Sequence, residues 1–290
     1  MTIEVVEFIQ SLRTGFGDVF FNFISFLGEE YVYIVILSII YFAYDKKLGE
    51  FVGFTMFVTG ILNAVIKGLV VAERPFQKYP DRITNLRPET SGGYSFPSGH
   101  TQMFTSFTFA LGFATKSKKI LYGAVVLSIL MAISRMYLGV HFLEDVTVGL
   151  VLGIAVAYLG YKFFYKIKDD DALLMKVYII ILVVFLPFVI ILNYEDLFKT
   201  YGLMVGFTFG MMIEKKHIQF TMDVSVVKKG IRVVIGLIIM VAIMVGLGSI
   251  FDMFAKEGTT LLNVLDFIRY GLIAFVGLGL YPFLFKKFNF

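Results

Sequence analysis

The chain has 290 residues, of which 58% are hydrophobic, and it carries a formal net charge of +4. Its mean hydropathy of +0.82 argues against a soluble protein, because soluble domains are about 45–50% apolar even with glycine included. Cysteine is absent, which excludes disulfides, thiolate metal sites and a cysteine nucleophile. The positive charges lie in short loops between apolar runs, and no nucleic-acid-binding pattern is visible, so no nucleic acid partner is expected.

The apolar runs predict an all-α, polytopic membrane bundle, because a spanning backbone must satisfy its own hydrogen bonds. Residues 3–12 predict a short amphipathic interfacial helix, and their acidic Glu4 and Glu7 argue against a removed signal peptide. About ten spanning segments follow, at roughly 20 apolar residues for each crossing. The first two are short and are separated only by Gly28-Glu29-Glu30, so a tilted or re-entrant pair is an alternative. The segments cover residues 14–29, 31–44, 50–72, 98–115, 119–139, 143–165, 173–193, 198–213, 230–250 and 261–285.

Lysines mark one side of the predicted bundle. If every segment crosses, one side collects Lys46, Lys47, Lys116, Lys118, Lys119, Lys162, Lys166, Lys168, Lys215, Lys216, Lys228, Lys229, Lys286 and Lys287. The positive-inside rule makes this side cytoplasmic, with both termini inside. The opposite side holds residues 73–97 and 139–143. Its Lys78, Arg82 and Arg87 run against the rule, which indicates either a role other than topology or a solvated loop.

Two segments carry small residues at every fourth position, namely Gly149, Gly153 and Ala157, and Gly202, Gly206 and Gly210. Small residues one turn apart let helix backbones approach closely in lipid. Helix packing is therefore favoured over a substrate path, and a homo-oligomer through these faces is a possible partner arrangement.

The first motif is Lys67 followed by Arg74-Pro75. A lysine deep in an apolar run is costly unless it is paired or faces a wet cavity. Snorkelling at a helix end explains the lysine alone. Together with the arginine and the two motifs below, an anion site is the better interpretation.

The second motif, Pro97-Ser98-Gly99-His100, directly precedes an apolar run and predicts a helix start. The backbone N–H groups exposed there can bind an anion, and Gly99 allows a phosphate to approach. An ordinary capped helix explains the proline and serine but not the histidine.

The third motif is Ser134-Arg135, with His141 and Asp145 beyond it. A helical start places His141 and Asp145 one turn apart on one face, where a carboxylate orients an imidazole. Arg135 adds a bidentate cation for phosphate oxygens. A structural His–Asp pair is the alternative. The third histidine, His217, receives no role, and no metal site or other cofactor is expected because no cluster has metal-ligand spacing.

The order and spacing of the three motifs resemble the signature of the type-2 phosphatidic acid phosphatase superfamily, with all eleven positions matched. The resemblance implies a transmembrane phosphatase core over residues 1–168, with six helices, and about four additional helices of unknown role over residues 169–290. It further implies an integral-membrane lipid phosphate phosphatase acting on a phosphomonoester or pyrophosphate without metal.

The resemblance implies a role for each residue that matches a motif position. His141 is the expected nucleophile that forms a phosphohistidine, Asp145 holds it, and His100 protonates the leaving alcohol and then activates water. Lys67, Arg74, Ser98, Gly99 and Arg135 are expected to bind the phosphate.

The expected substrate is a lipid phosphate whose tails stay in the bilayer, and the expected location is a prokaryotic plasma membrane with the site on the non-cytoplasmic side. A phosphotransferase with the same histidine is one alternative. A lipid transporter or scramblase is another, although it gives no reason for the His100, His141 and Asp145 set.

Overall fold

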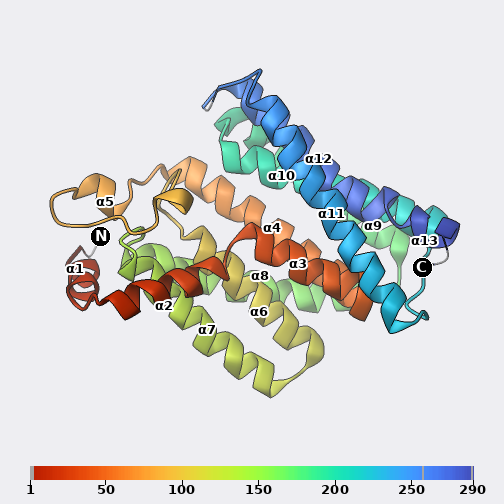
Figure 1. Ribbon diagram of the computed structural model, residues 1–290, viewed down its shortest axis with the longest axis horizontal. Coiled ribbons are helices and arrows are strands. Elements are labelled where there is room, and N and C mark those ends of the chain that lie inside the picture. Colours follow the sequence, from red (N-terminus) through yellow and green to blue (C-terminus); the bar gives the residue numbers. More distant parts are fainter. Residues whose placement is uncertain (1–2, 257, 289) are drawn as a thin grey trace. The chain divides into compact units, whose positions relative to one another are not determined.

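The computed structural model describes residues 3–256, 258–288 and 290, and these residues form helices without any β-strand (Figure 1). The predicted all-α membrane bundle is confirmed, and each of the ten predicted segments lies on a helix or a helix pair. The helices are α1 (Ile3–Ser11), α2 (Gly15–Phe26), α3 (Glu30–Ile39), η1 (Ile40–Tyr44), α4 (Lys46–Val70), α5 (Pro75–Lys78), η2 (Pro88–Thr90), α6 (Gly99–Thr115), α7 (Lys118–Tyr137), α8 (Leu143–Ile167), α9 (Asp171–Leu192), α10 (Glu195–Ile213), η3 (Glu214–Ile218), α11 (Val226–Phe251), α12 (Thr260–Phe275), η4 (Val276–Leu280) and α13 (Phe283–Phe288).

Short polar residues set the helix starts. Ser98 caps α6 by accepting the N–H of Thr101, and Ser117 caps α7 in the same way. Asp170 and Ser225 do so for α9 and α11. Such caps satisfy backbone donors that have no partner inside the helix. The sequence therefore fixes where the chain re-enters a helix after each loop.

Fewer helices than the ten predicted segments are both long and apolar enough to cross a membrane by themselves. Among the described residues six helices are, and α2 with α3–η1 makes a seventh if this pair, bent by 52°, is one span. The 17-residue α6 and the partly charged α10 fall outside this set. The alternative of a tilted or re-entrant first pair therefore describes the N-terminal segments better than two separate crossings.

The N-terminal helix lies against the loop that follows α4. Gln10 donates to the carbonyl of Thr84 (2.8 Å) and accepts from its N–H (3.1 Å), while Ile3 and Val6 pack with Ile83 and Phe142. The expectation that both termini lie on the lysine-rich side is therefore wrong for the N-terminus. The bent pair starts beside this loop and ends at Tyr44, directly before the lysine-rich start of α4, as a single broken span would.

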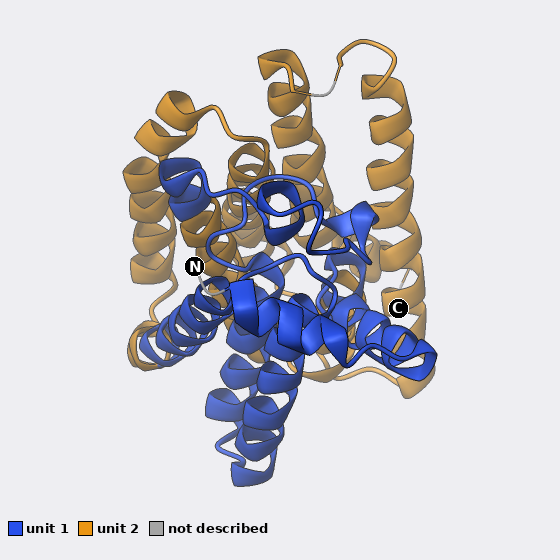
Figure 2. Cartoon of the chain, turned by 90° about the vertical axis from the view of Figure 1, so that its left-hand side faces the viewer, with its two compact units in different colours: residues 1–33, 65–161 blue, residues 34–64, 162–290 orange. Residues whose placement is uncertain are grey.

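Packing divides the chain into two compact units (Figure 2). Unit 1 comprises residues 1–33 and 65–161, and unit 2 comprises residues 34–64 and 162–290. The helices α3 and α4 each contribute to both units, so packing does not follow the predicted division at residue 168. All three sequence motifs belong to unit 1.

Both small-residue stripes pack inside the chain. A Cβ atom at Gly153 would lie 2.7 Å from the carbonyl oxygen of Gln102, so α8 lies directly against α6 in unit 1. A Cβ atom at Gly206 would lie 2.1 Å from the carbonyl oxygen of Gly271, so α10 lies against α12 in unit 2. The packing interpretation is confirmed, and a homo-oligomer would need another surface.

The contact between α10 and α12 leads to a stability prediction. Replacing Gly206→Ala forces two backbones apart, and we expect a loss of about 1–3 kcal/mol in the free energy of unfolding, as for other overpacked sites. Gly246→Ala in α11 is the matched control, since a Cβ atom there meets nothing within 4 Å. Alanine is the better helix former, so the control should be neutral or slightly stabilising. Thermal unfolding in detergent measures both, and equal melting temperatures would contradict this packing.

Candidate active site

The three sequence motifs meet at one end of the helices of unit 1. Each side chain is positioned by a helix end or by the loop beside it. Lys67 lies near the end of α4, Arg74 just before α5, His100 at the start of α6, Arg135 near the end of α7, and His141 and Asp145 around the start of α8. Five of these six side chains are in residues that are at most 5% exposed, and His100 is partly buried.

His141 and Asp145 form the predicted pair. The Nδ1 atom of His141 lies 3.3 Å from Oδ2 of Asp145, one turn apart at the start of α8. The same carboxylate oxygen accepts the backbone N–H of Phe142 (2.9 Å), which is half of a capping box. The helix start therefore fixes the carboxylate, and the carboxylate orients the imidazole.

Arg74 lies against the other nitrogen of the imidazole. Its Nη1 atom is 3.1 Å from Nε2 of His141. A guanidinium only donates hydrogen bonds, so this contact assigns the lone pair to Nε2 and the proton to Nδ1, which faces Asp145. Burial, together with the charges of Arg74 and Arg135, lowers the pKa of His141 well below its ordinary value. The imidazole is therefore neutral and has its basic nitrogen directed at a cation site.

Backbone carbonyls hold Arg74 in place. Its guanidinium donates to the carbonyls of Gly92 (2.6 Å), Gly93 (3.1 Å) and Val140 (3.1 Å). Val71 ends α4 in a left-handed conformation with φ 52°, which is rare for a β-branched residue. This turn stops the helix between Lys67 and Arg74.

Arg135 is buried with most of its hydrogen-bonding capacity unused. Its residue is 0% exposed, and its Nη1 atom donates to the hydroxyl of Ser25. Its Nε and Nη2 atoms have no partner in the part of the chain that the structure describes, and no described carboxylate lies within ion-pair distance. A buried charge without a partner is strongly unfavourable, so an anion bound at this guanidinium would stabilise it.

His100 faces the same group of charges. Its Nε2 atom is buried and has no described hydrogen-bond partner, and it lies within electrostatic range of His141, Arg135, Arg74 and Lys67. Gly28 allows the turn between α2 and α3 to reach this ring, since a Cβ atom there would lie 3.1 Å from Cδ2 of His100. The imidazole is thus available to a molecule that enters the site.

The remaining predicted phosphate ligands are Lys67 near the end of α4 and Ser98 and Gly99 at the start of α6. The Nζ atom of Lys67 donates to the carbonyl of Tyr94 (2.8 Å). Ser98 is 0% exposed, caps α6 with its hydroxyl and donates its N–H to the carbonyl of Asp145 (3.0 Å). In the described structure Ser98 therefore acts as a cap. Gly99 begins α6 and is partly exposed, as an anion site at a helix start requires.

The three additional cations have structural partners or a stacking contact. Arg82 donates to Glu7, and Arg87 pairs with Glu29 and donates to Asn22 (2.9 Å). Lys78 lies over the ring of Tyr79. For Arg82 and Arg87, the role other than topology is to tie the loop of residues 79–91 to the N-terminal helices.

Two serines belong to the site and were missed from the sequence. The hydroxyl of Ser95 donates to Oδ2 of Asp145 (2.6 Å), and Ser25 is the partner of Arg135. Ser95 lies two residues before Pro97, so its position beside a motif was the available signal. Ser25 lies 110 residues from its partner and carried no signal.

The unpaired guanidinium predicts that oxyanions stabilise the protein. Inorganic phosphate at about 100 times its dissociation constant should raise the free energy of unfolding by about 2.7 kcal/mol. Arg135→Met should remove most of this phosphate effect. Without phosphate, the variant should be at least as stable as the parent, because the substitution removes a buried charge that has no partner. Thermal shift assays with and without phosphate measure both, with Arg13→Gln as a control at an exposed ion pair. An equal phosphate shift in both variants would contradict the assignment.

Known proteins share this arrangement of motifs. The pattern of the PAP2 superfamily matches residues 51–169, and that of the transmembrane extension of PAP2 superfamily phosphatases matches residues 198–290. Phosphatidylglycerophosphatase B of Bacillus subtilis is 35% identical over 145 residues, which cover 47% of this chain and 68% of that protein. Undecaprenyl-diphosphatase of Sulfolobus acidocaldarius is 29% identical over 139 residues, which cover 48% of this chain and 66% of that protein.

A solved structure is also similar. Aquifex aeolicus LpxE aligns with a TM-score of 0.49 and 26% identity over 55% of this chain and 93% of that chain. The chain spans about two thirds of the length of the two curated relatives, both of which are named as phosphatases of lipid-linked phosphates. With the family pattern over the site and its transmembrane extension over the C-terminal helices, this chain belongs to the PAP2 superfamily of membrane lipid phosphatases.

Proposed function

We propose that this protein hydrolyses a phosphomonoester or pyrophosphate of a membrane lipid through a phosphohistidine at His141, without a metal ion. The observation that carries the proposal is the buried guanidinium of Arg135, whose Nε and Nη2 atoms have no described partner beside a neutral, oriented imidazole. A phosphoryl group supplies both the missing negative charge and an electrophile. Family membership supports the same reaction class.

The reaction divides into two displacements at phosphorus. The Nε2 lone pair of His141 attacks phosphorus, the N–P bond forms, and the bond to the lipid oxygen breaks. His100 enters this step as an imidazolium, which the negative charge of the bound phosphoryl group stabilises. It gives one proton to that oxygen and becomes neutral, and the lipid alcohol or lipid monophosphate leaves. Water then gives a proton back to His100 and attacks phosphorus, which releases inorganic phosphate and His141. Covalent catalysis of this kind replaces one difficult step with two easier ones.

Fixed cations stabilise both steps. Arg74, Arg135 and Lys67 converge where charge develops on the phosphoryl oxygens, and Asp145 stabilises the positive imidazole that forms. Arg74 must exchange its contact with Nε2 for a phosphoryl oxygen before attack. The Gly99 backbone N–H at the start of α6 is a further donor, whereas Ser98 contributes by holding that helix start.

The position of the site supports a lipid substrate. It lies at the ends of α4, α6, α7 and α8, so a phosphate can enter it from the membrane interface while the tails remain in the bilayer. The loops that carry it are opposite the lysine-rich loops, which favours a non-cytoplasmic site in a prokaryotic plasma membrane. The role of residues 169–290 as an accessory transmembrane part belongs to this proposal.

The two competing functions make different predictions. A phosphotransferase shares the phosphohistidine but passes the group to an added alcohol, so phosphorylated alcohol would replace inorganic phosphate. A transporter or scramblase would retain lipid movement in His141→Ala. The transporter gives no reason for the unpaired Arg135 near a histidine nucleophile, whereas the phosphotransferase needs both and differs only in the acceptor of the phosphoryl group.

The first activity prediction concerns the nucleophile and metals. Phosphate release from a panel of lipid phosphates should persist in excess EDTA, and His141→Ala should lower kcat by more than about a thousandfold. The panel contains phosphatidic acid, phosphatidylglycerol phosphate, a prenyl diphosphate and a sphingoid-base phosphate. Acid-labile phosphate should remain on the rapidly quenched parent protein but not on the variant. Release that survives the substitution, or that needs a divalent metal, would overturn the mechanism.

The second activity prediction concerns Ser95. Ser95→Ala removes a 2.6 Å hydrogen bond to Asp145, and we expect kcat to fall about tenfold to a hundredfold with little change in KM. Ser95→Thr keeps the hydroxyl and should restore much of the loss. Ser249→Ala, at an exposed serine of α11, is the control.

A double variant separates positioning from general instability. In Asp145→Asn the effect of Ser95→Ala should largely disappear, because residues that act as a unit are not additive. An additive loss, or an equal loss in the Ser249→Ala control, would show that Ser95 does not act through Asp145.

A further inference from the structure

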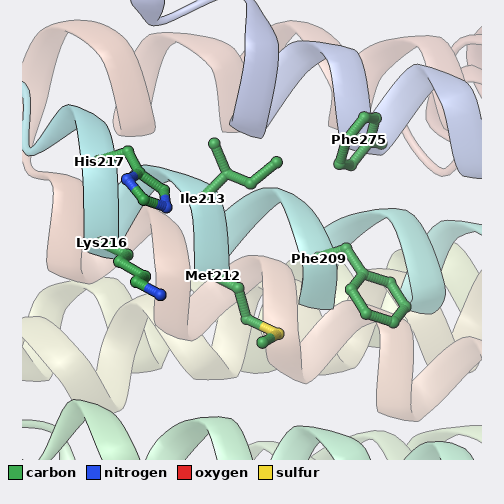
Figure 3. A pocket seen from close by; sticks show the side chains of 6 residues that line it. All are labelled: Phe209, Met212, Ile213, Lys216, His217 and Phe275. Atoms are coloured by element: carbon green, nitrogen blue, oxygen red, sulfur yellow. The ribbon is translucent and has the colours of Figure 1, made fainter.

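A groove outside the catalytic site lies along the C-terminal half of α10 in unit 2. Its volume is about 470 Å³, and its walls come from α10, η3 and α12. The lining side chains are Phe209, Met212, Ile213, Lys216, His217 and Phe275. Figure 3 shows Lys216 and His217 together at one end and the two phenylalanines at the other. The groove therefore has a basic end and an apolar end.

The helix η3, which carries Lys216 and His217, is held by the two residues that precede them. Glu214 is 0% exposed, accepts from Lys46 (2.5 Å) and accepts the backbone N–H of Phe220 (3.2 Å). Lys215 pairs with Glu50 (2.9 Å) and Asp171 (2.5 Å). These contacts direct Glu214 and Lys215 inward, and Lys216 and His217 are exposed.

The basic end has no acid of its own. The acids that surround this segment already pair with Lys46 and Lys215. Within residues 3–256, 258–288 and 290, no carboxylate lies within ion-pair distance of Lys216 or His217. The Nζ atom of Lys286 approaches the carbonyl of His217 (3.4 Å) and adds a further positive charge. This end of the groove can therefore accept an anion without displacing an acid of the chain.

The length and polarity of the groove match one lipid. Seven residues of helix separate Phe209 from Lys216, a rise of about 10 Å, which takes a head-group phosphate and the upper part of an acyl chain. Lys216 belongs to the lysine-rich loops of the predicted topology, at head-group level. A soluble anion would gain no binding energy from the four apolar side chains that line the groove. Snorkelling of Lys216 to the interface would explain the lysine but not the groove beside it.

We propose that this groove binds one anionic glycerophospholipid, with its phosphodiester at Lys216 and His217 and an acyl chain along Phe209, Met212, Ile213 and Phe275. The lipid is a ligand of the transmembrane extension and not a substrate of the catalytic site. The proposal is independent of the proposed function, because it rests on residues of unit 2 and is measured as binding.

The experiment compares lipid retention by the full chain. The protein is purified in detergent and incubated with equal amounts of phosphatidylglycerol and phosphatidylcholine, and retained lipid is counted by native mass spectrometry. The parent should retain one phosphatidylglycerol in preference to phosphatidylcholine. The double variant Lys216→Gln/His217→Gln should weaken phosphatidylglycerol binding about fivefold or more, the effect of about one basic residue at an anionic head group.

Two further variants make the outcome specific. Lys118→Gln/Lys119→Gln removes two exposed charges from the start of α7 and should leave retention unchanged. Met212→Trp fills the groove without changing the charge and should also reduce retention. The proposal is overturned if the parent shows no preference for phosphatidylglycerol, if both charge variants lose it equally, or if Met212→Trp retains it fully.

Discussion

The constraint on which the site depends is the burial of the Arg135 guanidinium with no described carboxylate within ion-pair distance. Arg135 is fully buried, and its described partner is a neutral serine hydroxyl. Arg74 is held by carbonyl dipoles and an imidazole, and Lys67 donates to a carbonyl. Of these three cations it is Arg135 whose Nε and Nη2 atoms have no partner in the described part of the chain. A buried charge with unused donors costs stability. In the proposed function, a phosphoryl group supplies the charge that Arg135 lacks.

The surrounding fold keeps these charges in place. Helix ends supply most of the side chains, and caps at Ser98 and Asp145 fix where two of those helices begin. At Gly153 the backbone of α8 lies close to that of α6, and the turn at Gly28 lies against the His100 ring. These close approaches help distant motifs to meet. Because packed helices deform little, a shift of one helix end would move a cation away from the phosphate position. The packing that stabilises the bundle therefore also fixes the geometry of the site.

The sequence predicted the helices, the small-residue packing and the six charged or catalytic side chains, because each depends on local pattern. Helix caps, apolar length and the spacing of His141 and Asp145 are visible over a few residues. The contacts of Ser25 and of Gln10 are not, since they join segments 110 and 74 residues apart. The predicted position of the N-terminus was wrong because it came from counting charges in loops. Charge counting does not show that α2 and α3–η1 form one bent pair.

In the proposed mechanism, the three cations that bind the substrate phosphate also bind the product. Inorganic phosphate presents the same oxygen atoms to Arg74, Arg135 and Lys67 that the ester presented before cleavage. Affinity gained from fixed cations is therefore uniform across ground states and does not by itself accelerate turnover. In that mechanism, release of inorganic phosphate competes with bond breaking as the slowest step, and accumulated inorganic phosphate would inhibit the enzyme.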